Sequence, residues 1–224
     1  MPVGELKPPK RQSTVEYVAE QLRGAIMAGR LEQGEQLGET ELAERLDVSR
    51  GPLREAMQRL VAEGLLHAIR NRGVFVTELS TDDVEDIYRT RSAIERAALE
   101  LVMAERREET VRALEPSITS MRAAARRGSA SGVSDADHAF HEKLVACSQS
   151  PRLIRAMRTL VVETRMCLGE LQTTYPDLST QVREHEELTE AIAAGTLTEA
   201  KDLLVAHMDD AVARLVSKRT PSAS

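Results

Sequence analysis

Aromatic residues and cysteines are scarce in this chain of 224 residues. It has no tryptophan, three tyrosines and two phenylalanines, too few for the stacked platforms on which many proteins bind single-stranded nucleic acid. The two cysteines, Cys147 and Cys167, do not form a CxxC pair, so they indicate neither a disulfide framework nor a thiolate zinc cluster. We expect both to be small buried apolar residues.

Long apolar runs are also missing. No stretch approaches the roughly 18 to 20 consecutive apolar residues of a membrane-spanning helix. The segment from Met1 to Arg11 lacks the apolar core of a signal peptide. These two absences predict a cytoplasmic protein with no membrane partner.

The net charge of -6 argues against a protein that coats nucleic acid indiscriminately. Charge is unevenly distributed, however, because the segment from Arg45 to Arg72 holds six arginines and three acidic residues. A local basic surface in an acidic chain is typical of a protein that binds nucleic acid at one place.

The first 78 residues predict a small DNA-binding fold. Residues 1–12 contain three prolines and little apolar periodicity, which indicates a flexible arm. Helical spacing of apolar residues then predicts helices at 14–28 and 39–46, and a third between Ser49, a suitable N-cap, and Gly64. The apolar period next falls from about 3.6 residues to about 2. It predicts a hairpin with strands at 67–69 and 74–76, so residues 13–78 read as a winged helix-turn-helix with three helices and a β-hairpin wing.

The rest of the chain is helical in pattern, which makes the predicted fold class mainly α. A linker at 79–81 precedes a helical bundle at 82–217, and residues 218–224 are expected to be a flexible tail. We expect Pro116 to kink or restart one helix, and loops at 128–132 and 173–176. The six expected helices span residues 82–105, 108–127, 134–148, 151–171, 178–194 and 198–217.

The third helix carries the residues expected to contact DNA. Arg50 and Arg54 share one face near its start, where arginine can bind guanine or phosphate, and Ser49 can donate to a phosphate. Arg70 and Arg72 lie on the hairpin turn, within reach of the DNA backbone or the minor groove. Surface arginines are often merely solvated, but their coincidence with this arrangement of elements favours DNA contact.

Four residues of the helical bundle have the chemistry of metal ligands. Asp137 and His141 are four residues apart and therefore on one helix face. His185 and His207 each lie on an apolar stripe and should point into the core. A lone histidine on such a stripe is usually a hydrogen-bonded core residue, but four inward ligand groups favour a divalent ion, with Zn²⁺ first and Ni²⁺ or Mn²⁺ as alternatives.

Arg91 lies on another apolar stripe, where an unpaired charge would be costly. Two partners would satisfy it equally well. One is the carboxylate of a bound ligand. The other is an internal carboxylate, either Glu95 or Glu163.

The segment LAERLDVSRGPLREAM at residues 42–57, with Arg72-Gly73 on the wing, resembles the DNA-binding domain of the GntR family of bacterial regulators. The resemblance spans about residues 15 to 77. It implies that Arg50 and Arg54 contact operator bases and phosphates and that the wing around Gly73 approaches the minor groove. Gly51 stands where the family commonly has threonine, so a hydroxyl contact is lost and operator preference can differ.

The second half resembles the FCD domain, the effector-binding bundle of the FadR subgroup of that family. The resemblance rests on Arg91 to Glu95, on DHAFH at residues 137–141, on Glu184-His185 and on His207. It implies that Asp137, His141, His185 and His207 bind a metal ion, and that the effector is a small carboxylate. Six helices rather than seven place the chain nearer the VanR branch than the acyl-CoA-binding member.

Two other functions remain open at this stage. One Asp and three His can activate water on a metal, as in hydrolases, although neither a nucleophile motif nor a phosphate-binding loop accompanies them. The metal can also be structural, or absent. We expect a homodimeric repressor rather than an enzyme, because a two-fold protein with two recognition helices suits an inverted-repeat operator on double-stranded DNA.

Overall fold

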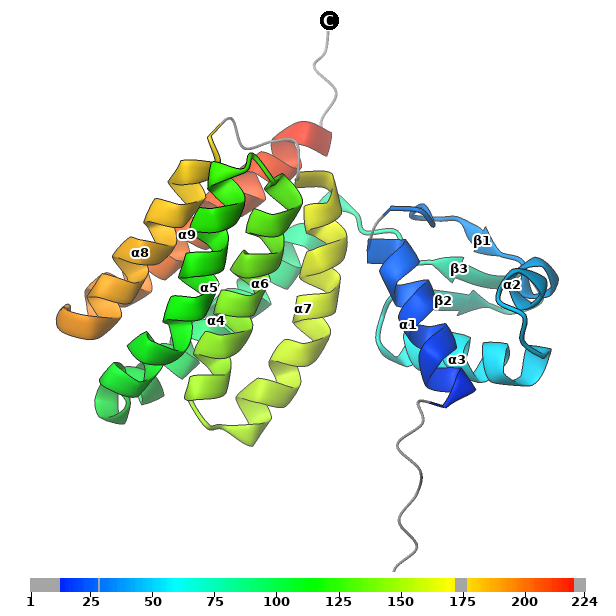
Figure 1. Cartoon of the computed structure of the whole chain (residues 1–224), viewed down its shortest axis with the longest axis horizontal. Helices are drawn as coiled ribbons and strands as arrows, with labels where there is room; N and C mark the ends of the chain where they lie inside the picture. Colours follow the sequence, from blue (N-terminus) through cyan, green and yellow to red (C-terminus); the bar gives the residue numbers. More distant parts are fainter. Residues whose placement is uncertain (1–12, 28, 172–176, 220–224) are drawn as a thin grey trace, which may run out of the picture. The chain divides into compact units, whose positions relative to one another are not determined.

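The computed structural model describes residues 13–27, 29–171 and 177–219, and the chain divides into two compact units, Met1–Glu78 and Leu79–Ser224 (Figure 1). Within the described residues it has nine helices and one three-stranded sheet. This confirms the predicted fold class. The expected arm at 1–12, the expected loop at 173–176 and most of the expected tail lie outside the described residues.

The first unit is a winged helix-turn-helix. Apolar Val18 and Leu22 of the first helix are buried, as are Leu53 and Leu60 of the third, and these two helices pack on each other. That packing turns the opposite side of the third helix to solvent. The elements are α1 (Thr14–Met27), β1 (Gln36–Leu37), α2 (Glu39–Arg45), α3 (Arg50–Ala62), β2 (Leu66–Ile69) and β3 (Gly73–Val76).

The wing is a sheet of order β1-β3-β2, with all pairs antiparallel. Asn71 and Gly73, in the turn and at the start of β3, have φ angles of 61° and 105°, in the left-handed region that asparagine and glycine tolerate best. The strand β1 was not predicted from the sequence. A two-residue strand between Gly34 and Gly38 offers no alternation by which to detect it.

The second unit is a bundle of six helices, as expected. Its core includes Met121 and Ala124 of the second helix, Val133 and Ala136 of the third and Val182 of the fifth. This packing fixes the helices that carry three of the four candidate metal ligands. The helices are α4 (Thr81–Glu105), α5 (Arg107–Arg126), α6 (Ala130–Cys147), α7 (Pro151–Leu171), α8 (Leu178–Ala194) and α9 (Leu197–Arg219).

Several predicted boundaries were wrong. The loop expected at 128–132 is shorter, because the Ser129 side chain accepts a hydrogen bond from the Gly132 amide and α6 begins at Ala130. At the other end of the bundle, α9 continues to Arg219, into the expected tail. Cys167 is buried as expected, whereas Cys147 is only half-buried.

Pro116 does not restart a helix, because α5 runs without interruption through it. A proline removes the hydrogen bond to the carbonyl four residues earlier, here that of Arg112. Both residues are exposed, so water can satisfy that carbonyl.

Arg107 joins the ends of two helices. Its Nε donates to the Met103 carbonyl over 3.0 Å, and its Nη1 donates to the carbonyls of Ile192 and Gly195 over 3.2 and 2.8 Å. Met103 is in the last turn of α4, and Ile192 and Gly195 are at the end of α8. Carbonyls at helix C-termini lack partners within the helix, so one guanidinium ties these two ends together.

No helix in the part of the chain that the structure describes is long and apolar enough to cross a bilayer.

Candidate metal centre and DNA-contact surface

The N-terminal end of α3 presents two exposed arginines. Arg54 is 62% exposed and its Nε donates to Oε2 of Glu39 over 2.7 Å, while Nη2 of Arg50 donates to the Thr40 hydroxyl over 3.0 Å. Exposed pairs of this kind contribute only about 0 to 1 kcal/mol. Both arginines can therefore exchange these α2 partners for DNA at small cost.

Ser49 and Gly51 flank Arg50 and leave this end of the helix open. Ser49 occupies the N-cap position with an extended backbone, but its side chain makes no capping hydrogen bond. The predicted N-cap position is confirmed, but the expected side-chain cap is not formed, and the hydroxyl is left for another partner. A Cβ built on Gly51 would meet no atom within 4 Å.

Arg70, Arg72 and Gly73 are exposed at the tip of the wing. The Arg72 guanidinium lies 5.8 Å from the centre of the Phe75 ring, a cation-π arrangement that holds it along the wing. The wing therefore presents two cationic side chains to solvent, as contact with a phosphate backbone requires.

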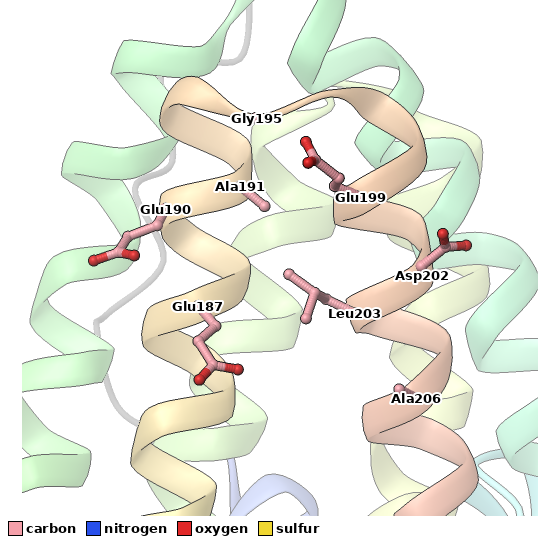
Figure 2. Close-up of a pocket in the computed structure, with 8 residues that line it drawn as sticks. All are labelled: Glu187, Glu190, Ala191, Gly195, Glu199, Asp202, Leu203 and Ala206. Carbon is pink, nitrogen blue, oxygen red and sulfur yellow. The ribbon is translucent and has the colours of Figure 1, made fainter.

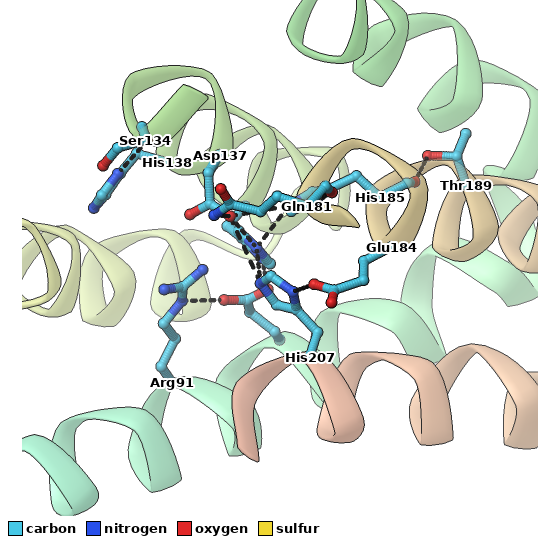
Figure 3. A network of polar contacts seen from close by, with 11 residues as sticks. Arg91, Ser134, Asp137, His138, Gln181, Glu184, His185, Thr189 and His207 are labelled. Carbon is cyan, nitrogen blue, oxygen red and sulfur yellow. Dashed lines mark hydrogen bonds and ion pairs between the residues drawn. The ribbon is translucent and has the colours of Figure 1, made fainter. Parts of the chain in front are cut away.

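The four side chains predicted to bind a metal meet inside the second unit (Figure 3). Asp137 and His141 extend from α6, His185 from α8 and His207 from α9, and all four are buried. Oδ1 of Asp137 is 3.1 Å from Nε2 of His185, 3.6 Å from Nε2 of His207 and 3.7 Å from Nε2 of His141. Nε2 of His141 is in turn 3.3 Å from Nε2 of His185 and 3.3 Å from Nε2 of His207.

These separations suit ligands that share one ion. Nitrogen and oxygen ligands bind Zn²⁺ at about 2.1 Å, so neighbouring ligands are about 3.4 Å apart in a tetrahedral site and about 3.0 Å apart at right angles. One ligand atom from each of the four residues lies within 4.8 Å of the others. The donor set therefore fits a divalent metal ion.

Each histidine is oriented by its second ring nitrogen. A nitrogen that donates to an oxygen carries the proton, which leaves Nε2 unprotonated and able to bind a metal. The three Nδ1 contacts are from His141 to Oε2 of Glu95 at 2.5 Å, from His185 to the Gln181 carbonyl at 2.7 Å and from His207 to Oε2 of Glu184 at 2.8 Å.

The centre also attracts positive charge. Burial alone would raise the pKa of Asp137, but the His141 ring holds it well below its usual range, and burial of Glu95 is likewise outweighed by His141 and Arg91, which lower its pKa to about 2. Burial lowers the pKa of His207 to about 4. The pKa of His141 is raised by Glu95 and Asp137 despite burial and Arg91. Because Arg91 balances the charge of Glu95, it is the ionised Asp137 carboxylate that favours a cation here.

Arg91 forms the internal ion pair that the sequence offered as one of two alternatives. Its Nε donates to Oε1 of Glu95 over 2.7 Å, and both side chains are almost completely buried. Its Nη2, however, is buried without a hydrogen-bond partner among the described residues. Because Glu95 also accepts from His141, Glu95 links Arg91 to the candidate metal centre.

The other two histidines are not among the four. His67, in β2, is exposed and stacks on Phe75 with ring centres 5.7 Å apart. His138 is 2% exposed, and its Nδ1 donates to the Ser134 carbonyl over 2.7 Å. Burial lowers the pKa of His138 to about 4.

Sequence reasoning missed the residues that orient the ligands. Glu95 was considered only as a partner of Arg91, Glu184 was named only as part of the family resemblance, and Gln181 was not named. Glu184 directly precedes His185, but its contact is with His207 on the next helix. Gln181 is one turn before His185, and its amide lies 3.5 Å from Asp137. The signal that could have found Gln181 and Glu184 was that polar residues lie within one helical turn of the candidate ligand His185.

A separate groove of 610 Å³ lies between α8 and α9 (Figure 2). It shares no residue with the candidate metal centre. Its carboxylates would repel an anionic ligand, so it is not suited to a carboxylate effector. The acidic residues around it are Glu187, Glu190, Glu199 and Asp202.

Comparisons with known proteins cover both units. The family model described as bacterial regulatory proteins, gntR family, matches residues 14–76, and the FCD domain model matches residues 86–210. The uncharacterized HTH-type transcriptional regulator YdhC of Bacillus subtilis (strain 168) is 32% identical over 190 residues, which are 84% of this chain and 85% of that protein. The gluconate operon transcriptional repressor of Bacillus licheniformis is 28% identical over 200 residues, 87% of this chain and 80% of that protein.

A solved structure has the same architecture. The crystal structure of a GntR transcriptional regulator from Rhodococcus sp. RHA1 superposes with a TM-score of 0.80 and is 27% identical. The match covers 92% of this chain and 99% of that one.

Proposed function

Because this chain belongs to the GntR family of bacterial regulatory proteins and carries an FCD domain, we propose that it is a homodimeric repressor that a small carboxylate releases from its operator. The observation that carries the effector part is the meeting of four metal-ligand atoms, to which Arg91, whose Nη2 is unpaired, is linked through Glu95. The relative from Bacillus licheniformis is a repressor of a gluconate operon, and gluconate is a carboxylate.

The DNA-binding part of the proposal rests on α3 and the wing. Arg50 and Arg54 are exposed at the start of α3, the part of a recognition helix that reads base edges in the major groove. Ser49 has an unused hydroxyl beside them, and Gly51 leaves room for close approach of the DNA. We assign Arg70, Arg72 and Gly73 to backbone or minor-groove contact.

The cofactor that we assign is Zn²⁺, with Ni²⁺ and Mn²⁺ as alternatives, because imidazole with one carboxylate suits each of them. When bound, the ion supplies a Lewis-acidic centre that attracts carboxylate oxygens. Asp137, His141, His185 and His207 hold it, and Arg91 gives the effector carboxylate a second partner through Nη2. Six described helices after Leu79 support the VanR-like branch of the FadR subgroup.

Transmission to DNA runs along α4. This helix begins at Thr81, three residues after the boundary between the two units, and it carries Arg91 and Glu95. An effector bound to Arg91 therefore acts on the helix to which the DNA-binding unit is joined. A coupling free energy of about 1 to 3 kcal/mol is typical of such linkage.

The test starts from operator sequences selected out of a random duplex library with the full-length, zinc-loaded protein. Selection should yield an inverted repeat, and sedimentation should show a dimer on it. Small carboxylates are then screened for release of the duplex by fluorescence anisotropy. His207→Ala protein that is folded by circular dichroism should bind the duplex but not respond to the active acid. If the folded, zinc-free variant released DNA at the same acid concentration as the wild type, direct binding of the acid at the metal centre would be wrong.

A further inference from the structure

His138 has one unused hydrogen-bonding atom. Its ring is 2% exposed, and Nδ1 is 2.7 Å from the Ser134 carbonyl (Figure 3). A carbonyl only accepts, so Nδ1 of the neutral ring donates and Nε2 carries no proton. Nε2 is therefore an acceptor, and it is buried with no partner among the described residues. Such an atom calls for a donor.

Two unused donors come from the neighbouring helices. Nη2 of Arg91 on α4 and Nε of Arg165 on α7 are also buried without hydrogen-bond partners in the described part of the chain. The helices α4, α6 and α7 pack on one another in all three pairs. The three atoms thus lie on three helices that are mutual neighbours, and the charges of Arg91 and Arg165 both act on the His138 ring. In Figure 3 the Arg91 side chain points toward the α6 segment that carries Asp137 and His138.

The three atoms define the chemistry of a ligand that would satisfy them. Two guanidinium donors suit a carboxylate. The imidazole acceptor requires a hydrogen-bond donor, either a hydroxyl or an amine. An ammonium group would be repelled by the two guanidinium charges beside it, whereas a hydroxyl carries no charge. The set therefore favours a ligand with both a carboxylate and a hydroxyl.

We propose that His138 is the hydroxyl-recognising residue of the effector site, and that the effector is a hydroxycarboxylate whose hydroxyl donates to Nε2 of His138 while Arg91 and Arg165 bind its carboxylate. This inference rests on the proposed function, because it assumes an effector in the second unit. His138 follows Asp137 directly, so its side chain leaves α6 about 100° around the helix from that ligand. It contacts the effector from a different side and is not a fifth metal ligand.

The test is calorimetric titration of the full-length, zinc-loaded dimer with matched acids. L-lactate is compared with propionate, L-malate with succinate, and D-gluconate with hexanoate. The wild type should bind at least one hydroxy acid about tenfold or more tightly than its partner, because a site built to bind a hydroxyl rejects the analogue that lacks it. His138→Phe keeps a ring but has no acceptor, so the preference should fall about tenfold. His67→Phe, on the exposed wing, should keep it.

Two measurements separate this role from a structural one. The zinc content of His138→Phe should equal that of the wild type, since His138 is not a ligand. In the wild type, ¹⁵N spectra of the histidine rings should show Nε2 of His138 unprotonated, and its resonance should move when the hydroxy acid binds but not when the deoxy acid does. This spectrum needs no variant and applies even where His138→Phe fails to fold.

Each remaining outcome overturns the inference in a distinguishable way. Equal binding of hydroxy and deoxy acids, or a preference that His138→Phe leaves intact, would mean that water satisfies Nε2 and that the proposed function alone survives. An unchanged Nε2 resonance with a bound hydroxy acid has the same meaning. If none of the six acids binds the wild type or releases its operator, the proposed carboxylate response is wrong as well.

Discussion

His207 on α9 and Glu184 on α8 are joined by a hydrogen bond of 2.8 Å from Nδ1 to Oε2, on the ring edge opposite the nitrogen that faces the metal ligands. The bond fixes the tautomer and direction of His207 before a metal arrives. A carboxylate in this position also makes the imidazole a stronger donor to the ion.

Replacing Glu184 with glutamine should therefore weaken zinc binding without removing a ligand. The amide oxygen still accepts from Nδ1, but the negative charge is lost, and changes of this kind cost about 10- to 100-fold in metal affinity. Competition with a chromogenic chelator measures the zinc affinity of each variant. Glu190→Gln, exposed on the same helix, is the matched control and should bind zinc like the wild type. Equal affinities in both variants would show that the carboxylate does not tune the site.

Removing the metal should destabilise the second unit. An ion that binds only the folded chain stabilises it by about 2.7 kcal/mol when its concentration is 100 times the dissociation constant. Differential scanning calorimetry of the full chain should thus show a lower Tm for the bundle after chelation. Asp137→Asn protein, which keeps the three histidines but lacks the carboxylate among the four ligands, should show a smaller drop in Tm on chelation. A wild-type Tm that is the same with and without chelator would contradict a bound metal.

Arg50→Ala and Arg54→Ala should each weaken operator binding by about 1 to 3 kcal/mol if they contact guanines. The α2 contacts that they give up are exposed and contribute little. Titration of the selected operator at fixed salt measures the loss. Arg89→Ala, 72% exposed in the second unit, should bind like the wild type. Unchanged affinity in both α3 variants would remove these residues from the DNA contact.

Arg72→Ala should behave differently from the α3 variants. A phosphate or minor-groove contact carries little base information, so affinity should fall by a similar factor for specific and random duplexes. The slope of log affinity against log salt should become shallower by about 1. Titrations at four salt concentrations distinguish this from the sequence-dependent loss in Arg50→Ala. A loss confined to the specific operator would assign Arg72 to base recognition instead.

Two glycines should respond to alanine in opposite directions. At Gly195 a Cβ would sit 2.9 Å from the Ala191 carbonyl oxygen, so Gly195→Ala should destabilise the fold by about 1 to 3 kcal/mol. At Gly51, inside α3, the space is open, and Gly51→Ala should stabilise by roughly 0.5 to 1 kcal/mol. Urea denaturation gives the free energy of unfolding of each variant and so the direction of each change. A Gly195→Ala protein more stable than the wild type would contradict the prediction.

Much of the fold was predictable because helices leave a regular signature. The spacing of apolar residues located all nine helices of the described chain, and a change of period located the hairpin. Helical spacing also placed Asp137 and His141 on one face and pointed His185 and His207 inward, where the structure brings the four together. A two-residue strand such as β1 has no period and was missed.

The partners of the ligands were not predictable, because they depend on how helices pack. Glu184 reaches His207 only because α8 lies beside α9, and Glu95 reaches His141 only because α4 lies beside α6. Spacing within one helix says nothing about such pairs. The ion pair of Arg91 with Glu95, four residues along the same helix, was the exception that the sequence could offer.

The Arg107 bridge holds the C-terminal end of α4 against that of α8. Because one guanidinium binds the ends of both α4 and α8, we expect these ends to stay together, near Met103, if α4 moves. Arg91 is 12 residues from Met103, about 18 Å along the helix, and Thr81, the first residue of α4, is 22 residues away, about 33 Å. Rotation about the Met103 end moves the far end of α4 nearly twice as far as it moves Arg91. If α4 moves as a rigid rod about that end, a displacement of about 1 Å at Arg91 becomes about 2 Å at the first residue of the helix.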